Sequence, residues 1–255
     1  MPPILKHHVL IVGGTSGIGF AVAELALASG CTVAIASSNP TRISSAIIRL
    51  QASFLDKKSL ISGHEIDLQT PDIEARLTTL FDAVTSNKSK LLNHIVFTAG
   101  RIPKLKPLPE MDIISTLNLT QSSLSAPLAL GKLAPPYLVP SYSSSITLTG
   151  GRVADKPLPN YTLFSFYASG LHGLVKSLAF DLAPIRVNMA SPGATVTEMW
   201  GPEEVREMMA KKVGETALLG KVGSAEEVAE GYVYFMRDWN VTGEVLRSEG
   251  GAILQ

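Results

Sequence analysis

The chain has 255 residues, of which 45% are hydrophobic and 17% are charged, and its 22 Lys and Arg residues balance its 22 Asp and Glu residues. This length and composition predict one domain, residues 1–255, with a large core. The balanced charge argues against a nucleic-acid-binding surface, and no apolar run reaches the roughly 18 residues that a membrane span requires. The single cysteine, Cys31, and the lack of an export signal near Met1 predict a cytoplasmic protein without a disulfide. We predict no metal site.

Short β-branched runs alternate along the chain with longer segments of helical period. This alternation predicts an α/β fold with a single Rossmann-type, doubly wound parallel sheet of about seven strands and helices on both faces. The predicted strands span residues 8–12, 32–36, 60–64, 93–98, 144–149, 186–190 and 244–246. The predicted helices span residues 17–29, 41–55, 71–85, 111–133, 159–182, 202–212 and 225–236. Pro127 should kink or break the fourth helix, because proline has no backbone N–H.

A glycine-rich segment lies between the first predicted strand and the first predicted helix. Glycines there let the backbone turn sharply and approach a pyrophosphate, whose charge is bound by amide groups at the helix N-terminus. The candidate cofactor-binding residues in this segment are Gly13, Thr15, Ser16, Gly17, Ile18 and Gly19. Three glycines alone are weak evidence, but their position between a hydrophobic strand and a helix favours dinucleotide binding over a purely structural turn.

The end of the second strand distinguishes NADP(H) from NAD(H). An acid at that position hydrogen-bonds the adenosine ribose of NAD and repels the 2′-phosphate of NADP. The chain has no acid there and instead carries Ser37 and Ser38, followed by Arg42 in the first turn of the next helix. Hydroxyl donors and a guanidinium suit a phosphate, so we predict NADP(H). The alternative is that the serines only end the strand and that Arg42 is a solvated helix charge.

Over essentially its full length the chain resembles the short-chain dehydrogenase/reductase family. Beyond the glycine motif, the resemblance rests on short segments that follow the later predicted strands, namely Asp67-Leu68, Thr98-Ala99-Gly100, Ser191-Pro192-Gly193 with Thr195 and Thr197, and Glu249-Gly250-Gly251. It implies that the first of these contacts adenine, that Ala99 and Gly100 form a turn at the cofactor, and that the segment from Pro192 to Thr197 meets the nicotinamide carboxamide. Asn118 falls where the family has a catalytic asparagine.

The reaction centre departs from the family pattern. In the family, a serine and a tyrosine hold and protonate the carbonyl oxygen during hydride transfer, and a lysine lowers the tyrosine pKa. Here Phe166 takes the tyrosine position, Gly170 takes the lysine position, and the serine position falls on Gly151 or its neighbour Gly150. Tyr167 is one residue away, which turns its side chain by about 100° on a helix. Thr149 or Tyr161 could replace the lost acid from a different backbone position.

The altered centre disfavours ordinary ketone reduction. Losing a positioned proton donor costs about 10²- to 10⁴-fold in rate when an alkoxide forms, whereas hydride addition to an iminium-type cation needs no proton. Phe166, Gly170 and Gly173 recur at i, i+4 and i+7, which predicts a wide apolar cavity for a bulky substrate. The alternative is that small residues only allow close helix packing. The chain also resembles fungal secondary-metabolism reductases that couple iminium reduction to Diels-Alder cyclisation in indole-alkaloid pathways.

Three functions fit the sequence. The first is an NADPH-dependent reductase of a bulky, cationic small molecule; the second is a non-redox isomerase or cyclase with a structural dinucleotide; the third is an inactive dinucleotide-binding scaffold or sensor. The family resemblance implies a homodimer or homotetramer formed through the helices at 111–133 and 159–182. It also implies a mobile substrate lid at residues 197–213, where Met199, Trp200 and Met208 offer an adaptable apolar surface.

Overall fold

A seven-stranded parallel sheet forms the centre of the computed structural model, which describes residues 2–100, 105–114, 116 and 121–255. The strand order is β3-β2-β1-β4-β5-β6-β9. The strands are β1 His8–Val12, β2 Thr32–Ser37, β3 Ile61–Glu65, β4 His94–Phe97, β5 Ser145–Thr149, β6 Arg186–Pro192 and β9 Val245–Ser248. The doubly wound parallel sheet expected from the sequence is therefore confirmed.

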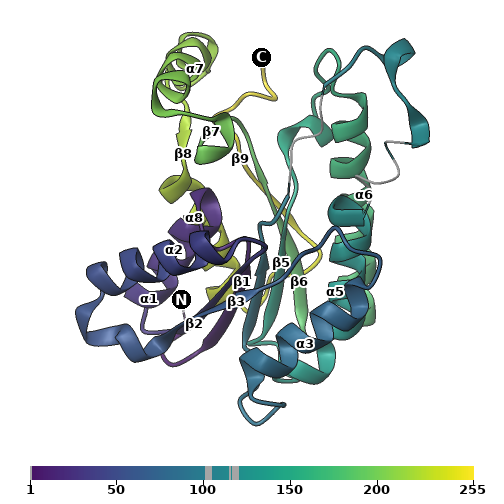
Figure 1. Ribbon diagram of the computed structural model, residues 1–255. Coiled ribbons are helices and arrows are strands. Elements are labelled where there is room, and N and C mark those ends of the chain that lie inside the picture. The colour runs from purple at the N-terminus through teal and green to yellow at the C-terminus, as the bar shows by residue number, and fades with distance from the viewer. Residues whose placement is uncertain (1, 101–104, 115, 117–120) are drawn as a thin grey trace.

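Helices cover both faces of this sheet, as Figure 1 shows. One face carries α1 Gly17–Ala28, α2 Pro40–Ser53 and α8 Ala225–Arg237, and the other carries α3 Ile73–Thr85, α5 Ala126–Leu133 and α6 Thr162–Asp181. Within the described ranges, no helix is long and apolar enough to cross a membrane. A small parallel pair, β7 Thr195–Val196 with β8 Gly223–Ser224, follows the end of β6 and flanks α7 Glu203–Thr216.

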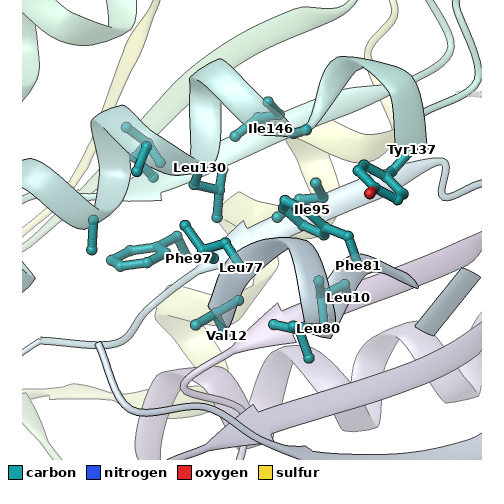
Figure 2. Packing of buried hydrophobic residues seen from close by; sticks show 14 of the residues in the cluster. Leu10, Val12, Leu77, Leu80, Phe81, Ile95, Phe97, Leu130, Tyr137 and Ile146 are labelled. Carbon is teal, nitrogen blue, oxygen red and sulfur yellow. The ribbon is translucent and has the colours of Figure 1, made fainter. Parts of the chain in front are cut away.

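The two helical layers bury two hydrophobic clusters, because successive side chains of a strand point to opposite faces of the sheet. In β1, Leu10 and Val12 pack towards α3, α5 and α6, whereas Val9 and Ile11 pack towards α1 and α8. Figure 2 shows the first cluster, in which the ring of Phe81 from α3 lies among strand side chains such as Leu10. Strands buried on both faces explain why their sequences read as continuous apolar runs.

The fourth predicted helix is helical at residues 113, 114, 116 and 121–133, which the structure describes, but it changes type along its length. Within the described part of residues 111–133, a π-helix at Gln121–Ser125 precedes α5, which begins only at Ala126. Pro127 lies in the first turn of α5, as expected of a residue that cannot donate a helical hydrogen bond. The other predicted elements are present with small shifts at their ends. Short 3-10 helices and the β7–β8 pair were not predicted, because they are too short to show a period.

Candidate functional site

The candidate site lies at the carboxyl ends of the parallel strands. In this sheet the chain runs outward from β1 in one direction through β2 and β3, and in the other through β4, β5 and β6. A reversal of this kind creates a crevice between β1 and β4, where doubly wound folds bind their ligands. The segments that carry the sequence motifs follow directly after β1, β2, β4, β5 and β6.

The glycine segment after β1 is packed so closely that side chains are excluded. Gly13 has φ +97°, and a Cβ there would lie 2.6 Å from the amide nitrogen of Ala99. A Cβ on Gly19 would lie 2.3 Å from the carbonyl oxygen of Gly13. The turn after β4 closes against this segment, since the Thr98 hydroxyl donates to the Val12 carbonyl at 3.2 Å. The glycine segment and the turn after β4 therefore lie in direct contact.

The N-terminus of α1 lies at this crevice and is not capped by its own N-cap residue. Ser16 occupies the N-cap position, yet its side chain makes no capping hydrogen bond, and the first turn of α1 contains no acidic residue. The N–H of Gly17 instead donates to the carboxylate of Glu198 at 2.9 Å. Thr15 is buried, and Ile18 packs against the core beneath α1. A helix N-terminus without a cap from its own N-cap residue, beside close-packed glycines, fits the pyrophosphate of a dinucleotide.

The end of β2 presents the residues predicted to read the ribose phosphate. Asn39 caps α2 by accepting a hydrogen bond from the Arg42 backbone N–H at 3.0 Å, which fixes the helix start beside Ser37 and Ser38. Arg42 is exposed there. After β3, the Asp67 carboxylate accepts from the Gln69 backbone N–H at 2.9 Å, and the neighbouring Leu68 is buried. These positions suit the adenosine end of the dinucleotide.

The segment after β6 reaches the same helix N-terminus. A Cβ on Gly193 would lie 2.7 Å from Cα of Glu249, so the chain after Pro192 requires glycine to pass the end of β9. The buried Thr195 hydroxyl donates to the Gly193 carbonyl at 3.2 Å. The methyl group of Thr197 approaches Gly17 closely, because a Cβ built on Gly17 would lie 2.9 Å from it. The residues present therefore fit a nicotinamide dinucleotide along the whole crevice.

The α6 face that should hold the catalytic residues is exposed and apolar. Phe166 is 61% exposed, and Gly170 and Gly173 are exposed on the same stripe. A Cβ on Gly170 would contact a flexible side-chain end, Leu124 Cδ2, at 3.2 Å, and one on Gly173 would have no atom of the described residues within 4 Å. A different stripe of α6 packs into the core, since Leu171 and Leu178 are buried.

Neither the Tyr167 hydroxyl nor the Thr149 hydroxyl points to this face. Tyr167 is 2% exposed, and its hydroxyl donates to the Thr116 carbonyl at 2.9 Å. The Thr149 hydroxyl donates to the Phe97 carbonyl at 2.7 Å and lies 2.6 Å from the Tyr232 hydroxyl of α8, on the opposite face of the sheet from α6. The structure therefore does not bring Thr149 to the α6 face.

The two glycines at the family's serine position, Gly150 and Gly151, differ in the space available for a side chain. Gly151 has room for one, because the nearest atom to a Cβ there is Phe164 Cζ at 3.7 Å, whereas a Cβ on Gly150 would meet Met189 at 2.8 Å. Tyr161 is the N-cap of α6, and its ring centroid lies 6.3 Å from that of Phe164. Asn118 lies outside the described residues. Packing therefore does not force the loss of a serine side chain at position 151.

A family model for an SDR-like Rossmann domain, where SDR denotes short-chain dehydrogenase/reductase, matches residues 4–255. The chain belongs to the short-chain dehydrogenase/reductase family. The resemblance seen in the sequence is thus confirmed over nearly the whole chain. The Rossmann domain of this family binds a nicotinamide dinucleotide, in agreement with the crevice described above.

Two fungal members of the family are especially similar. The short-chain dehydrogenase/reductase ATR9 of Stachybotrys chlorohalonatus is 42% identical over 256 residues, which cover 100% of both chains. The short-chain dehydrogenase/reductase malC of Malbranchea aurantiaca is 36% identical over 255 residues, covering 97% of this chain and 95% of the relative. The solved structure of the MalC reductase/Diels-Alderase from the same organism superposes with a TM-score of 0.92 at 35% identity, covering 99% and 98% of the two chains.

Sequence reasoning missed one residue of this short-chain dehydrogenase/reductase site. Glu198 directly follows Thr197 in the segment after β6, and its carboxylate contacts the α1 N-terminus. The signal in the sequence was the presence of an acid next to a threonine predicted to contact the cofactor. Its partner, Gly17, lies far away in sequence, so the spacing of motifs did not show the contact.

Proposed function

We propose that this protein is an NADP(H)-dependent reductase whose substrate is bulky, apolar and cationic, of the iminium type. The observation that carries the proposal is the exposed ring of Phe166 at the tyrosine position of α6, next to the side-chain-free Gly170. This arrangement leaves the dinucleotide cradle intact while removing the phenol and the ammonium group that ketone reduction uses.

The residues of the reaction centre favour a cation over a neutral carbonyl compound. An aromatic face attracts a positive charge within about 6 Å of its centre, and Phe166 offers such a face to solvent. A lysine at position 170 would repel a cation at 4 Å by about 4 kcal/mol at an effective dielectric of 20, and glycine removes that repulsion. When bound, NADPH would supply the hydride by breaking the C4–H bond of its nicotinamide ring, and it would leave as NADP+. The new C–H bond forms at the iminium carbon, the C=N π pair becomes the nitrogen lone pair, and no proton is required.

The preference for NADP(H) is proposed from the chain's own residues. The 2′-phosphate of the cofactor would lie between Ser37, Ser38 and the exposed Arg42 at the first turn of α2. No carboxylate follows β2 to repel it. NADPH should bind at least about tenfold more tightly than NADH, and Arg42→Ala should narrow this difference in isothermal titration. Equal affinities in the wild type would contradict the NADP(H) assignment.

Cyclisation after reduction is supported by the likeness to the MalC reductase/Diels-Alderase. An intramolecular cycloaddition needs confinement and orientation more than acid or base chemistry, and positioning alone can lower a barrier by several kcal/mol. In this proposal, the exposed apolar stripe of α6 and the methionine-bearing segment at α7 confine the reduced product. Met199 and Met208 are 56% and 65% exposed there.

The test compares a permanent cation with a neutral ketone of similar size. N-methyl-3,4-dihydroisoquinolinium and 1-tetralone are supplied with NADPH, and cofactor oxidation is followed by absorbance. We expect the iminium to be reduced at least about 10²-fold faster than the ketone. The double variant Phe166→Tyr, Gly170→Lys should gain ketone reduction without accelerating reduction of the iminium.

Two phenol deletions serve as matched controls. Tyr161→Phe and Tyr167→Phe each remove a hydroxyl that could act as a relocated acid, and neither should lower iminium turnover in the folded protein. Wild-type reduction of 1-tetralone at the iminium rate, or loss of iminium turnover in either control, would contradict the proposal. NADPH binding without oxidation by either compound would instead favour a cyclase with a structural dinucleotide or an inactive scaffold.

A further inference from the structure

One backbone amide of the dinucleotide cradle is already hydrogen-bonded to a carboxylate of the chain itself. Glu198 begins the short 3-10 helix Glu198–Trp200, and its Oε2 accepts from the N–H of Gly17, the first residue of α1, at 2.9 Å. The natural capping residue, Ser16, makes no side-chain hydrogen bond to the helix. The carboxylate of Glu198 therefore serves as the cap of α1 in this state.

A second contact holds the same segment over the helix N-terminus. The methyl group of Thr197 lies close to Gly17, since a Cβ built on that glycine would be 2.9 Å from it and 3.6 Å from the Glu198 carboxylate. Gly17 has φ +51°, so this position favours glycine for its backbone conformation as well as for space. Thr197 and Glu198 thus cover the amide that the glycine motif presents to a phosphate.

A carboxylate and a pyrophosphate compete for this position. Both are anions attracted by the partial positive charge and the N–H groups of a helix N-terminus. Their mutual repulsion at contact distance opposes simultaneous binding. Glu198 is exposed, so water can hydrate its carboxylate once it leaves. Exchange of one anion for the other is therefore feasible at modest cost.

Two backbone hydrogen bonds hold the turn that carries Glu198 together. The N–H of Trp200 donates to the Thr197 carbonyl at 3.1 Å, and that of Gly201 donates to the Glu198 carbonyl at 3.1 Å. Gly201 follows at φ +102°, a Cβ at that position would have no described neighbour within 4 Å, and α7 begins at Glu203. A displacement of Glu198 therefore carries the apolar side chain of Met199 with it and can be absorbed at Gly201.

We propose that Glu198 is a placeholder for the cofactor pyrophosphate and that its release couples dinucleotide binding to rearrangement of the Thr197–Gly201 turn. The free protein keeps the α1 N-terminus capped by Glu198. Binding of the dinucleotide expels the carboxylate and displaces Met199, the residue that follows Glu198 in the same turn. The inference rests on the proposed function only in requiring that the chain binds a nicotinamide dinucleotide.

The test is the variant Glu198→Gln, which keeps the size and an oxygen acceptor but removes the charge. At low ionic strength, isothermal titration should show NADPH binding about three- to fivefold more tightly to the variant than to the wild type. The unliganded variant should melt at a lower temperature, because a neutral amide caps a helix dipole less well than a carboxylate. A tighter-binding variant with a less stable free state is the combined signature expected of a placeholder.

Two controls separate this effect from general electrostatics. Glu203→Gln removes a similar charge from the first turn of α7 and should leave the NADPH affinity unchanged. Adenosine 2′-monophosphate carries the ribose phosphate without a pyrophosphate, so its affinity should be the same for wild type and Glu198→Gln. The placeholder role would be overturned if Glu198→Gln bound both NADPH and adenosine 2′-monophosphate more tightly, or if Glu203→Gln also bound NADPH more tightly.

The remaining outcomes distinguish the two proposals. If NADPH binds the wild type and Glu198→Gln equally well, or binds the variant more weakly, the placeholder role is wrong and the proposed reductase function stands. If neither NADPH nor NADH binds any of the proteins in their folded state, both proposals are wrong.

Discussion

The two ends of the same parallel sheet are built in opposite ways. At the amino end, Arg186 and His94 are buried, at 3% and 0% exposure, and hydrogen-bonded within the chain. At the carboxyl end, glycines replace side chains, a helix N-terminus faces outward, and the ring of Phe166 is exposed. The amino end stabilises the fold, and the carboxyl end leaves backbone groups and apolar surface for ligands.

Arg186 shows how buried side chains stabilise the amino end of the sheet. Its guanidinium donates to the carbonyl oxygens of Phe235 at 2.6 Å and Asp238 at 2.8 Å, at the C-terminus of α8, and its Nε donates to the Tyr142 carbonyl at 2.6 Å. Burial lowers the pKa of Arg186 to about 10, which leaves it charged at neutral pH. A cation at a helix C-terminus is favourable, and here it also satisfies carbonyl groups that have no helical partner.

The largest expected effect is a loss of folding stability when Arg186, at the amino end of the sheet, is replaced. Arg186→Met should lower the free energy of unfolding by about 3 kcal/mol or more, because several buried carbonyl groups lose their donor. Arg186→Lys keeps the charge but loses the fork geometry and should recover only part of this loss. Urea unfolding measures both variants. A loss below about 1 kcal/mol for Arg186→Met would show that the amino end does not depend on this residue.

Two helical glycines, Gly19 and Gly173, test whether the close packing of the dinucleotide cradle requires glycine. Gly19→Ala should lower the free energy of unfolding by about 2 kcal/mol, because the added Cβ would lie 2.3 Å from the Gly13 carbonyl oxygen. Gly173→Ala meets no atom within 4 Å in the part of the chain that the structure describes, and it should raise the free energy of unfolding by about 0.5–1 kcal/mol, since alanine favours the helix. NADPH titration should show a loss of affinity for Gly19→Ala only. Equal behaviour of the two variants would contradict the close-packed cradle.

The smallest expected effect is a dependence of folding stability on pH, which arises mainly from His94 at the amino end of the sheet. His94 is hydrogen-bonded to His7 at 2.9 Å and to Ser145 at 2.8 Å. Burial, with smaller contributions from His7 and Arg186, lowers the pKa of His94 well below 6.5. The unfolded chain therefore binds a proton that the folded chain does not. Stability should fall by about 1.4 kcal/mol per pH unit for this group as pH drops below about 6.5.

The measurement is thermal or urea unfolding between pH 7.5 and 5.5, values chosen as about one unit either side of the free histidine pKa. His94→Gln should be less stable at neutral pH but should lose less stability on acidification. Burial also lowers the pKa of the other histidines, which are His7, His8, His64 and His172. His64→Gln, at a partly exposed position, should flatten the pH profile less. A profile for His94→Gln as steep as that of the wild type would rule out His94 as the main source.

Most of the fold could be predicted because its elements are long and strongly patterned. The strand His8–Val12 was predicted at both ends, since the apolar run stops at a glycine turn whose conformation only glycine adopts readily. The helix predicted at 111–133 is helical at residues 113, 114, 116 and 121–133, which the structure describes. Apolar periodicity did not show that Gln121–Ser125 form a π-helix rather than an α-helix.

The candidate site was predictable wherever a motif stands at the end of a strand. The positions of Gly13, Arg42 and Gly193 follow from the rule that all carboxyl ends of a parallel sheet meet at one edge. The orientation of hydroxyls did not follow in the same way. Thr149 was a candidate acid by sequence position, but strand alternation turns it towards Tyr232 on the opposite face.

The sequence alone determined that this chain forms a doubly wound sheet with a dinucleotide cradle and lacks the family's tyrosine and lysine, because these features depend on local patterns and on residue identity. Only the tertiary structure decided that Phe166 is exposed, that Tyr167 is buried, and that Glu198 reaches Gly17. These facts depend on how helices and loops distant in sequence pack together. Such contacts leave no periodic signal in a single chain, because they join residues whose separation is set by the fold rather than by the repeat of a helix or strand.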